Sequence, residues 1–437
     1  MNSTELRHQC ISSTLLGTIA GVLFCSLSMQ TALAAPAKPV KIQQIEMVQQ
    51  LPPAKTVALE ALIQRFNAEN ADINIRLTSQ SWNEKTPPHL LILNSSDEAT
   101  FLSGKPRFKP LYEVMKTAGI PLQTLKPPSF MTQTPVNSKG QLLALPVGLS
   151  TPVLFINKDA LRHAGLNPDT TRVDTWKALQ NVLGRLAETG HTCPYAVAEP
   201  ARVMIENLSA WHNEPITAVR GKNVTYSFNS MFQIKHIAMM ASWKRADYLH
   251  VFNSPQEAED RFSQGECAIL AASSANWSDF RHQNKGALDI GIHNLPYYED
   301  FVSSPQNTLA DGPSMWITAG KSPAEYKAIA RFVSYWLQPD NQVSWPRESG
   351  YLPLNRAGLL AASESSVLHD AFDGVRIALA QLTYRPVTPR SVAPSVAGSG
   401  REYMRQVLDE ELMAVWDDRK PAKEALDTAV IRVAKKR

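Results

Sequence analysis

The hydrophobic positions of this 437-residue chain change period repeatedly from one segment to the next. Apolar residues recur at helical spacing from Ala58 to Phe66. Val40 to Met47 alternates weakly, and Ile73 to Leu77 and Leu90 to Leu93 are short apolar runs, so all three predict strands. Strands alternating with helices indicate an α/β fold, for which we expect mostly parallel sheets.

The run from Ser150 to Leu166 contains a strand, a turn and a helix in close succession. Val153 to Ile156 is the apolar strand, and the helix is expected to begin near Asp159. The Asp159 carboxylate is the predicted cap, because it can accept hydrogen bonds from the first free amides. This helix is expected to end at Gly165, because glycine is typical of the position after a helix.

The rest of the chain is rich in helical patterns, with a weaker strand at Ala268 to Ala272. The predicted helices are Trp176 to Glu188, Val203 to Trp211, Gln233 to Ala246, Pro255 to Phe262, Ala324 to Leu337, Asp340 to Trp345, Met404 to Val415 and Pro421 to Lys435. After any leader is removed, roughly 400 residues remain, which is too long for one core, and two lobes are expected.

The N-terminal segment has the pattern of an export signal. Ile11 to Leu27 is an apolar and small-residue run, and Ala34 ends a small-x-small cleavage motif. A transmembrane anchor is the alternative reading of this run. A lipoprotein is disfavoured because the bulky Phe24 precedes Cys25. We therefore expect residues 1–34 to be a signal peptide that is cleaved near Ala34 on export to the periplasm.

The cysteines and the charged residues indicate which compartment and which partners the protein is expected to have. Cleavage would leave Cys193 and Cys267, an even pair for which a disulfide is expected in an oxidising compartment; two buried free thiols are the alternative. The chain has 44 Lys and Arg against 40 Asp and Glu, and its basic residues are dispersed, so no nucleic-acid partner is expected. No metal-site spacing surrounds the cysteines, and neither a metal nor a cofactor is expected.

The sequence also lacks the common catalytic motifs. It contains no G-x-S-x-G elbow, no H-E-x-x-H, no P-loop and no G-x-G-x-x-G after a strand. The histidines are scattered singly, and Asp409 to Glu411 is more simply read as a solvated helix face. An enzyme is therefore not expected.

Several motifs together resemble one family of binding proteins. The Ser150 to Leu166 run, with Thr175-Trp176 after it, is similar to the hinge-proximal segment of maltose-type extracellular solute-binding proteins of ABC importers. An ordered set of further matches most resembles the members that bind sn-glycerol 3-phosphate: Gln64 to Asn70, Lys109 to Gly119, Glu206 to Trp211, Lys235 to Met239, Gly265 to Ala268, Pro305 to Asn307, Gly350 to Pro353 and Asp409 to Trp416.

This resemblance implies the two-lobe periplasmic-binding-protein fold of type II, with helices flanking each sheet and a ligand cleft at the hinge. Residues 35–148 and 273–316 would form the first lobe. Residues 149–272 and 317–437 would form the second lobe. The implied function is that of a monomer that binds sn-glycerol 3-phosphate or a glycerophosphodiester and delivers it to an inner-membrane ABC permease with its ATPase.

The resemblance also implies a set of ligand contacts. Ser150, Ser273, Gly312, Tyr351 and Arg405 match family positions that hold the ligand, and Arg405 is the expected phosphate contact because a guanidinium offers a bidentate fork. The tryptophans expected near the cleft include Trp82 and Trp211, which complete the predicted ligand-binding set.

The chain departs from the family pattern at one side of the expected cleft. Glu199 and Arg202 stand where the family has two stacking tryptophans, and the segments that supply first-lobe contacts are altered or shortened. Arg202 either supplies a new anion contact or only pairs with Glu199. Two further hypotheses remain open: specificity shifted to another phosphorylated or anionic polyol or sugar, and a non-transport interaction protein that keeps the fold.

Overall fold

A computed structural model describes the chain over residues 42–78, 85–102, 107–120, 122, 135–137, 139–220, 223–284, 287–300, 305–354, 369–386 and 399–435. All of these residues belong to one compact unit, Ile42–Arg437. The expected signal peptide, residues 1–34 with cleavage near Ala34, lies outside the described residues. None of the helices in the described residues has the length and apolar character that crossing a membrane requires.

One sheet, which defines the first lobe, has the strand order β2-β1-β3-β12-β4. Its strands are β1 (Gln43–Gln49), β2 (Ile73–Thr78), β3 (Leu90–Leu93), β4 (Leu145–Pro146) and β12 (Ser314–Ile317). β1 pairs in parallel with β2 and β3, whereas β12 pairs antiparallel with β3 and β4. The sheet is therefore mixed rather than mostly parallel, because β12, which lies more than 150 residues after β4 in the chain, runs antiparallel to both of its neighbours.

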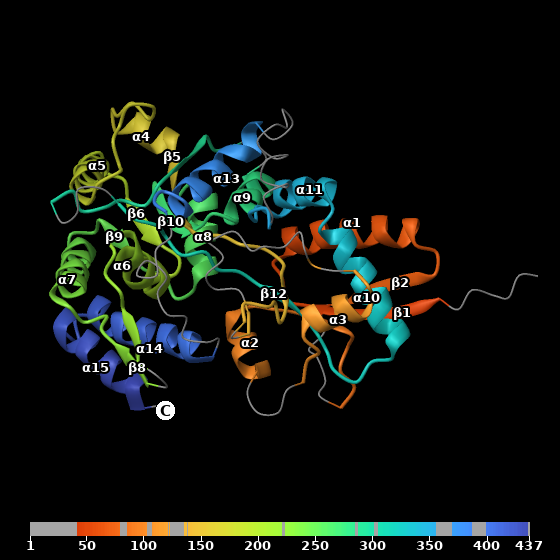
Figure 1. Cartoon of the computed structure of the whole chain (residues 1–437). Helices are drawn as coiled ribbons and strands as arrows, with labels where there is room; N and C mark the ends of the chain where they lie inside the picture. The colour runs from red at the N-terminus through yellow and green to blue at the C-terminus, as the bar shows by residue number, and fades with distance from the viewer. Residues whose placement is uncertain are drawn as a thin grey trace, which may run out of the picture. The chain divides into compact units, whose positions relative to one another are not determined.

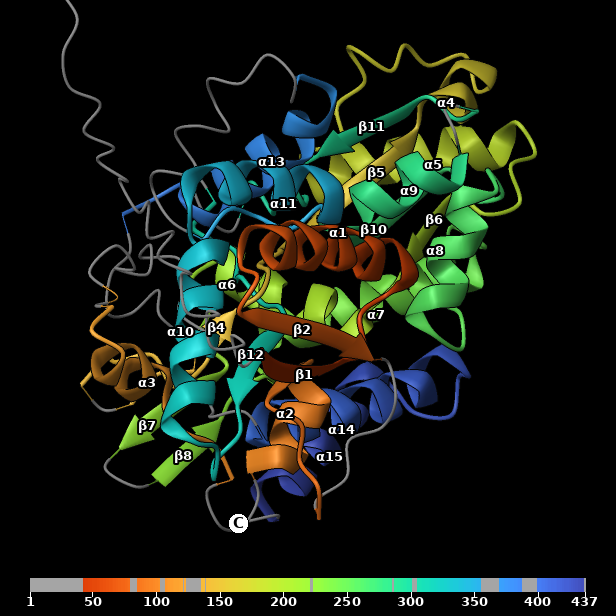
Figure 2. The same ribbon diagram turned by 90° about the vertical axis from the view of Figure 1, so that its right-hand side faces the viewer.

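Helices cover both faces of this sheet. They are α1 (Pro53–Glu69), α2 (Ser95–Leu102), α3 (Leu111–Thr117), α10 (Pro323–Trp336) and α11 (Pro339–Ser349). The apolar spacing of α1 correctly predicted its buried face, where Phe66 packs against Phe332 with ring centroids 5.1 Å apart. On the opposite face, Phe101 of α2 contacts Trp316 of β12. Figure 2 shows α1 and α2 on either side of β1.

A second sheet, which defines the second lobe, has the order β11-β5-β10-β6-β9. Its strands are β5 (Pro152–Asn157), β6 (Tyr195–Val197), β9 (Leu249–His250), β10 (Ile269–Ser273) and β11 (Ile290–His293). β10 pairs in parallel with β6 and antiparallel with β5, so this sheet is mixed as well. Every residue of β5 is buried, as expected for an interior strand, between β11 and β10, in a sheet covered on both faces.

The helices of the second lobe divide between the two faces of this sheet (Figure 1). One face is covered by α5 (Trp176–Glu188), the π-helix η1 (Ala201–Asn207), α6 (Leu208–Trp211), α7 (Met231–Arg245), α14 (Ser399–Trp416) and α15 (Ala422–Lys435). The other is covered by α8 (Pro255–Ser263), α9 (Asn276–Asn284) and α13 (His369–Leu382). A hairpin of β7 (Thr217–Arg220) and β8 (Asn223–Tyr226) stands apart from both sheets.

The helix after β5, α4 (Lys158–His163), begins with a cap that differs from the predicted one. The Asn157 side chain accepts hydrogen bonds from the backbone N–H groups of Asp159 and Ala160, at 3.0 and 3.2 Å. Asp159 therefore lies inside the first turn. Asn157 can take this role because it has extended backbone angles and a short side-chain carbonyl.

The chain crosses between lobes later than the boundaries 273–316 and 317–437 predicted. β11 pairs antiparallel with β5, so the chain is still in the second sheet at residue 293. α10 and α11 lie in the first-lobe core through Trp336 and Trp345, and the second lobe resumes near Leu352, which pairs with Leu149. Apolar periodicity identifies these elements, but it does not specify which of two sheets each covers.

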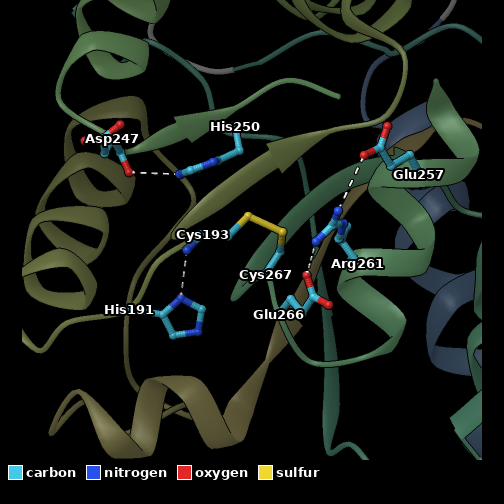
Figure 3. The surroundings of a disulfide bond; sticks show 8 residues. All are labelled: His191, Cys193, Asp247, His250, Glu257, Arg261, Glu266 and Cys267. Atoms are coloured by element: carbon cyan, nitrogen blue, oxygen red, sulfur yellow. Dashed lines mark hydrogen bonds and ion pairs between the residues drawn. A yellow bond between two sulfur atoms is a disulfide. The ribbon is translucent and has the colours of Figure 1, made fainter. Parts of the chain in front are cut away.

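The predicted disulfide between Cys193 and Cys267 is present (Figure 3). It joins the segments that lead into β6 and β10, two neighbouring parallel strands. The backbone N–H of Cys193 also donates to Nδ1 of His191 at 3.3 Å. The bond closes a 74-residue separation along the chain within the second lobe.

Candidate functional site

A cavity of about 840 Å³ is lined by residues from both lobes. The first lobe contributes Lys55 in the first turn of α1 and Ile92 in β3. The second lobe contributes residues before η1, on α8 and α9, and on α14, among them Arg405. Asp311 and Gly312 come from the segment that enters β12. A site of this size and position is typical of small-molecule binding proteins.

Five of the seven predicted ligand residues line this cavity: Ser150, Ser273, Gly312, Tyr351 and Arg405. Trp82 lies outside the described residues. Trp211 lies elsewhere, because its ring is 1% exposed, its Nε1 donates to the carbonyl of Leu295 at 3.2 Å, and it packs edge-on against Tyr384. Trp211 is thus a core residue.

Arg405 extends from α14 and is 12% exposed. Its guanidinium binds the Glu206 carboxylate with two hydrogen bonds, and Nη1 donates to Oδ2 of Asp311 at 2.6 Å. Burial acts to lower the Arg405 pKa, but the charges of Glu206 and Asp311 outweigh it and raise the pKa. Arg405 therefore enters the cavity charged, oriented and already paired.

Asp311 lies at the centre of this charge network. Although burial acts to raise its pKa, the guanidinium charges of Arg401, Arg405 and Arg202 hold the pKa far below its usual value. Arg401 approaches Oδ1 of Asp311 at 3.4 Å. The carboxylate remains ionised and fixes the positions of the guanidinium groups around it.

The two predicted serines form a chain of hydrogen bonds at the hinge. Ser273 Oγ donates to Ser150 Oγ at 2.8 Å, and Ser150 Oγ donates to the carbonyl of Asp311 at 3.2 Å. Arg202 Nη2 donates to the carbonyl of Ser150 at 3.2 Å and to its Oγ at 3.3 Å. These hydrogen bonds couple the segment before β5 to β10, to η1 and to the segment that enters β12, at the edge of the cavity.

Gly312 allows two segments of backbone to approach closely. A Cβ atom at this position would lie 2.0 Å from the carbonyl oxygen of Gly148, so a side chain cannot be accommodated without backbone movement. The Gly312 N–H donates to Oδ1 of Asp311 at 2.8 Å. The glycine thus brings Asp311 to the cavity, a structural role beside the ligand contact that the resemblance implies.

Tyr351 forms part of the cavity wall next to Gly148. Its ring occupies the space that a side chain at Gly148 would need, and it stacks on Trp345 at a centroid distance of 6.2 Å. Lys55 Nζ lies 5.6 Å from the Tyr351 ring centroid. Burial raises the pKa of Tyr351, so the phenol stays neutral and can donate a hydrogen bond.

The sequence did not predict the contact between Lys55 and Asp279, which joins the lobes beside the cavity. Lys55 belongs to α1 and Asp279 to α9, and their side chains form an ion pair in which Lys55 is 3% exposed. Adjacent to it, burial raises the pKa of Glu259 to about 7. Pairing of residues more than 200 positions apart leaves no local pattern in the sequence.

Glu199 and Arg202 also line the cavity. Arg202 belongs to η1, and its Nη1 donates to Oε2 of Glu199 at 2.8 Å. π-Helical turns are rare and frequently lie at functional sites. Within the described part of the chain, no group of three His, Cys, Asp or Glu side chains is arranged to hold a metal ion.

Known proteins match this chain along most of its length. Residues 61–364 match the family described as bacterial extracellular solute-binding protein. The sn-glycerol-3-phosphate-binding periplasmic protein UgpB of Yersinia enterocolitica serotype O:8 / biotype 1B is 30% identical over 93% of this chain and 95% of that protein. The protein of the same name from Escherichia coli strain K12 is 31% identical over 86% and 88%.

Solved structures of low sequence identity share the fold. UgpB from Mycobacterium tuberculosis in complex with glycerophosphocholine has a TM-score of 0.70 at 19% identity and covers 89% of this chain and 96% of its own. The GacH receptor of Streptomyces glaucescens GLA.O has a TM-score of 0.71 at 14% identity and covers 90% and 98%. The two-lobe fold is therefore confirmed, and the chain belongs to the bacterial extracellular solute-binding protein family.

Proposed function

We propose that this protein captures sn-glycerol 3-phosphate or a glycerophosphodiester and delivers it to an ABC permease and its ATPase in the inner membrane. The observation that carries the proposal is the convergence of Ser150, Ser273, Gly312, Tyr351 and Arg405 on one cavity. These residues come from five separate segments of the chain. The relatives at 30% identity or more that bear the name sn-glycerol-3-phosphate-binding protein support this choice of ligand.

The chemistry of the cavity suits a phosphorylated polyol. Arg405 keeps guanidinium N–H groups beyond those bonded to Glu206 and Asp311, so it can still donate to a phosphate oxygen. The hydroxyls of Ser150, Ser273 and Tyr351 can exchange hydrogen bonds with glycerol oxygens. Proteins of this family bind solutes and are not enzymes, so affinity arises from these contacts without covalent chemistry.

The two lobes supply opposite walls of the cavity, so ligand binding and lobe closure are coupled in this proposal. A ligand that contacts both walls favours the conformation in which they are close, because only there are all its contacts made. The permease would recognise that conformation. The protein would act as a monomer in the periplasm after cleavage of residues 1–34 near Ala34.

Thermal unfolding and calorimetric titration of the chain without residues 1–34 test the proposal. Ligand at 100 times its Kd stabilises the folded state by about 2.7 kcal/mol, which raises the Tm by a few degrees in a protein of this size. We expect that rise with glycerol 3-phosphate or glycerophosphocholine and not with glycerol at the same concentration. No heat of binding and no rise in Tm with either phosphoester would overturn the proposal.

A second candidate is the same role with specificity for another anionic polyol or sugar. Glu199 and Arg202 favour it, because they form a charged pair at the cavity wall where the sequence resemblance implies two stacking rings. Loss of aromatic stacking removes about 1 kcal/mol per ring. Stabilisation by a different phosphorylated polyol, without stabilisation by glycerol 3-phosphate, would select this alternative.

A further inference from the structure

The ion pairs around Arg405 join equal numbers of guanidinium and carboxylate groups before any ligand is bound, and Glu402, whose pKa burial raises, also lines the cavity. Three guanidiniums, those of Arg202, Arg401 and Arg405, are paired with three carboxylates, those of Glu199, Glu206 and Asp311. A phosphate adds at least one negative charge to this group. Because uncompensated charge is costly away from water, phosphate binding favours the departure of one of the carboxylates from its guanidinium.

The exposure of the three carboxylates identifies the one that can leave. The side chain of Glu206 is 2% exposed and that of Asp311 is 9% exposed, so neither can reach solvent without disrupting its surroundings. The side chain of Glu199 is 34% exposed and lies at the cavity wall. A rotation about its side-chain bonds would transfer this carboxylate from Arg202 to water.

Arg202 cannot follow Glu199 into solvent. Its side chain is 8% exposed, and its Nη2 is held by the carbonyl and hydroxyl of Ser150. Its Nε is buried and has no hydrogen-bond partner in the described part of the chain. Departure of Glu199 would free a donor at Nη1 of a fixed guanidinium, on a residue that lines the cavity together with Ser150 and Ser273.

We propose that Glu199 is a displaceable counter-ion of Arg202, and that the phosphate of the ligand takes its place on the Arg202 guanidinium. This inference rests on the proposed function, and it makes Arg202 a second phosphate contact beside Arg405. At this wall of the cavity, binding would depend on the exchange of the Glu199 carboxylate for the ligand phosphate rather than on aromatic stacking. Phosphate-bearing ligands would then be selected over neutral polyols, because only an anion can take over from the Glu199 carboxylate.

Calorimetric titration with glycerol 3-phosphate of the wild type and of four variants tests this exchange. Glu199→Gln removes the competing carboxylate and is expected to lower the Kd about two- to fivefold. Arg202→Gln is expected to raise the Kd about tenfold or more, and Arg202→Lys to recover only part of that loss. In the double variant Glu199→Gln/Arg202→Gln, the gain from Glu199→Gln should vanish, because the two residues act on each other.

Glu266→Gln is the matched control. Glu266 forms a half-exposed ion pair with Arg261, in which Oε2 and Nη1 are 2.7 Å apart (Figure 3), and neither residue lines the cavity. Its Kd should equal that of the wild type. Circular dichroism melting of each variant separates loss of binding from loss of folding.

The outcomes that would overturn the inference differ from the one that would overturn the proposed function. An unchanged or higher Kd for Glu199→Gln, or the same gain in the Arg202→Gln background, would show that Glu199 does not compete for Arg202. A wild type that binds neither glycerol 3-phosphate nor glycerophosphocholine overturns the proposed function itself. A wild type that binds while the Glu199 and Arg202 variants match Glu266→Gln overturns only the role of this pair.

Discussion

Arg405 illustrates how a binding residue is prepared for its ligand at the scale of a single side chain. Glu206 and Asp311 hold its guanidinium from two directions, and both carboxylates are themselves buried. The arginine therefore cannot adopt other rotamers in the absence of ligand, and little side-chain entropy remains to be lost on binding. The same pairing makes the residue important for the stability of the fold.

Replacing Arg405 by alanine is expected to affect both properties. Removing one partner of a buried ion pair leaves uncompensated carboxylates, so the free energy of unfolding should fall by about 3–5 kcal/mol. Binding of glycerol 3-phosphate should be lost. Chemical denaturation and calorimetry measure the two effects, and Arg405→Lys, which keeps the charge without the fork, should recover stability better than affinity. An Arg405→Ala protein with wild-type Kd would exclude Arg405 as a phosphate contact.

Some residues of the site could be predicted from the sequence and others could not. Ser150, Tyr351 and Arg405 could be placed because short motifs around them resemble a known family, whereas composition and periodicity gave no indication of them. The partners that neutralise Arg405 could not be predicted, since Glu206 and Asp311 are about 100 or more positions distant from it. Contacts of this kind are set by the tertiary fold.

Elements show a similar division between local and distant information. The apolar stripe of α1 and the continuous apolar run of β5 could be predicted because each depends on its own residues alone. The lobe to which β11 and α10 belong depends on where the chain crosses between the two sheets. The boundaries predicted from the sequence placed each of these elements in the other lobe. The π-helical turn of η1 had no signature that distinguished it from an α-helix.

The packing between α5 and α7 leads to a prediction about pH. His236 on α7 lies 4.7 Å from the Trp176 ring of α5, and its Nδ1 hydrogen-bonds with the Tyr298 hydroxyl at 2.8 Å. Burial lowers its pKa to about 3, so the folded protein holds it neutral. The unfolded chain binds a proton below about pH 6.5, so this residue destabilises the fold increasingly as pH falls through that value.

His236→Gln removes this dependence. As pH rises from 5 to 7, the unfolding free energy of the wild type should increase by about 2 kcal/mol relative to that of the variant. Urea denaturation at both pH values measures it, and taking the difference between proteins cancels other titrating groups that both share. His163→Gln, at an exposed position, is the control. The same pH dependence in wild type and His236→Gln would contradict a buried neutral imidazole.

At the scale of the whole molecule, Lys55 and Asp279 link the lobes beside the cavity, and α2 also contacts α14. The pair joins α1, which packs in the first-lobe core, to α9, which packs against the second sheet. Because Lys55 is almost fully buried, the ion pair exists only while these two helices remain close. The pair therefore contributes to the equilibrium between separated and adjacent lobes.

Lys55→Met should shift that equilibrium toward separation. We expect a Kd for glycerol 3-phosphate about tenfold higher, equal to about 1.4 kcal/mol, because more of the binding energy must bring the lobes together. The ligand-free radius of gyration from small-angle X-ray scattering should also increase. The double variant Lys55→Met/Asp279→Asn should bind better than Lys55→Met, since it leaves no unpaired carboxylate. Unchanged scattering and affinity would show that the pair does not link lobe position to binding.

The disulfide has a topological consequence for the cavity. The segment between Cys193 and Cys267 contains both Arg202 and Glu259, and each end of it is fastened to the same sheet. A protease that cut the backbone once within this segment would leave two fragments that stay covalently connected. The nicked protein would migrate as one species on a non-reducing gel, and the parts of the cavity wall on either side of the cut would remain tethered to each other.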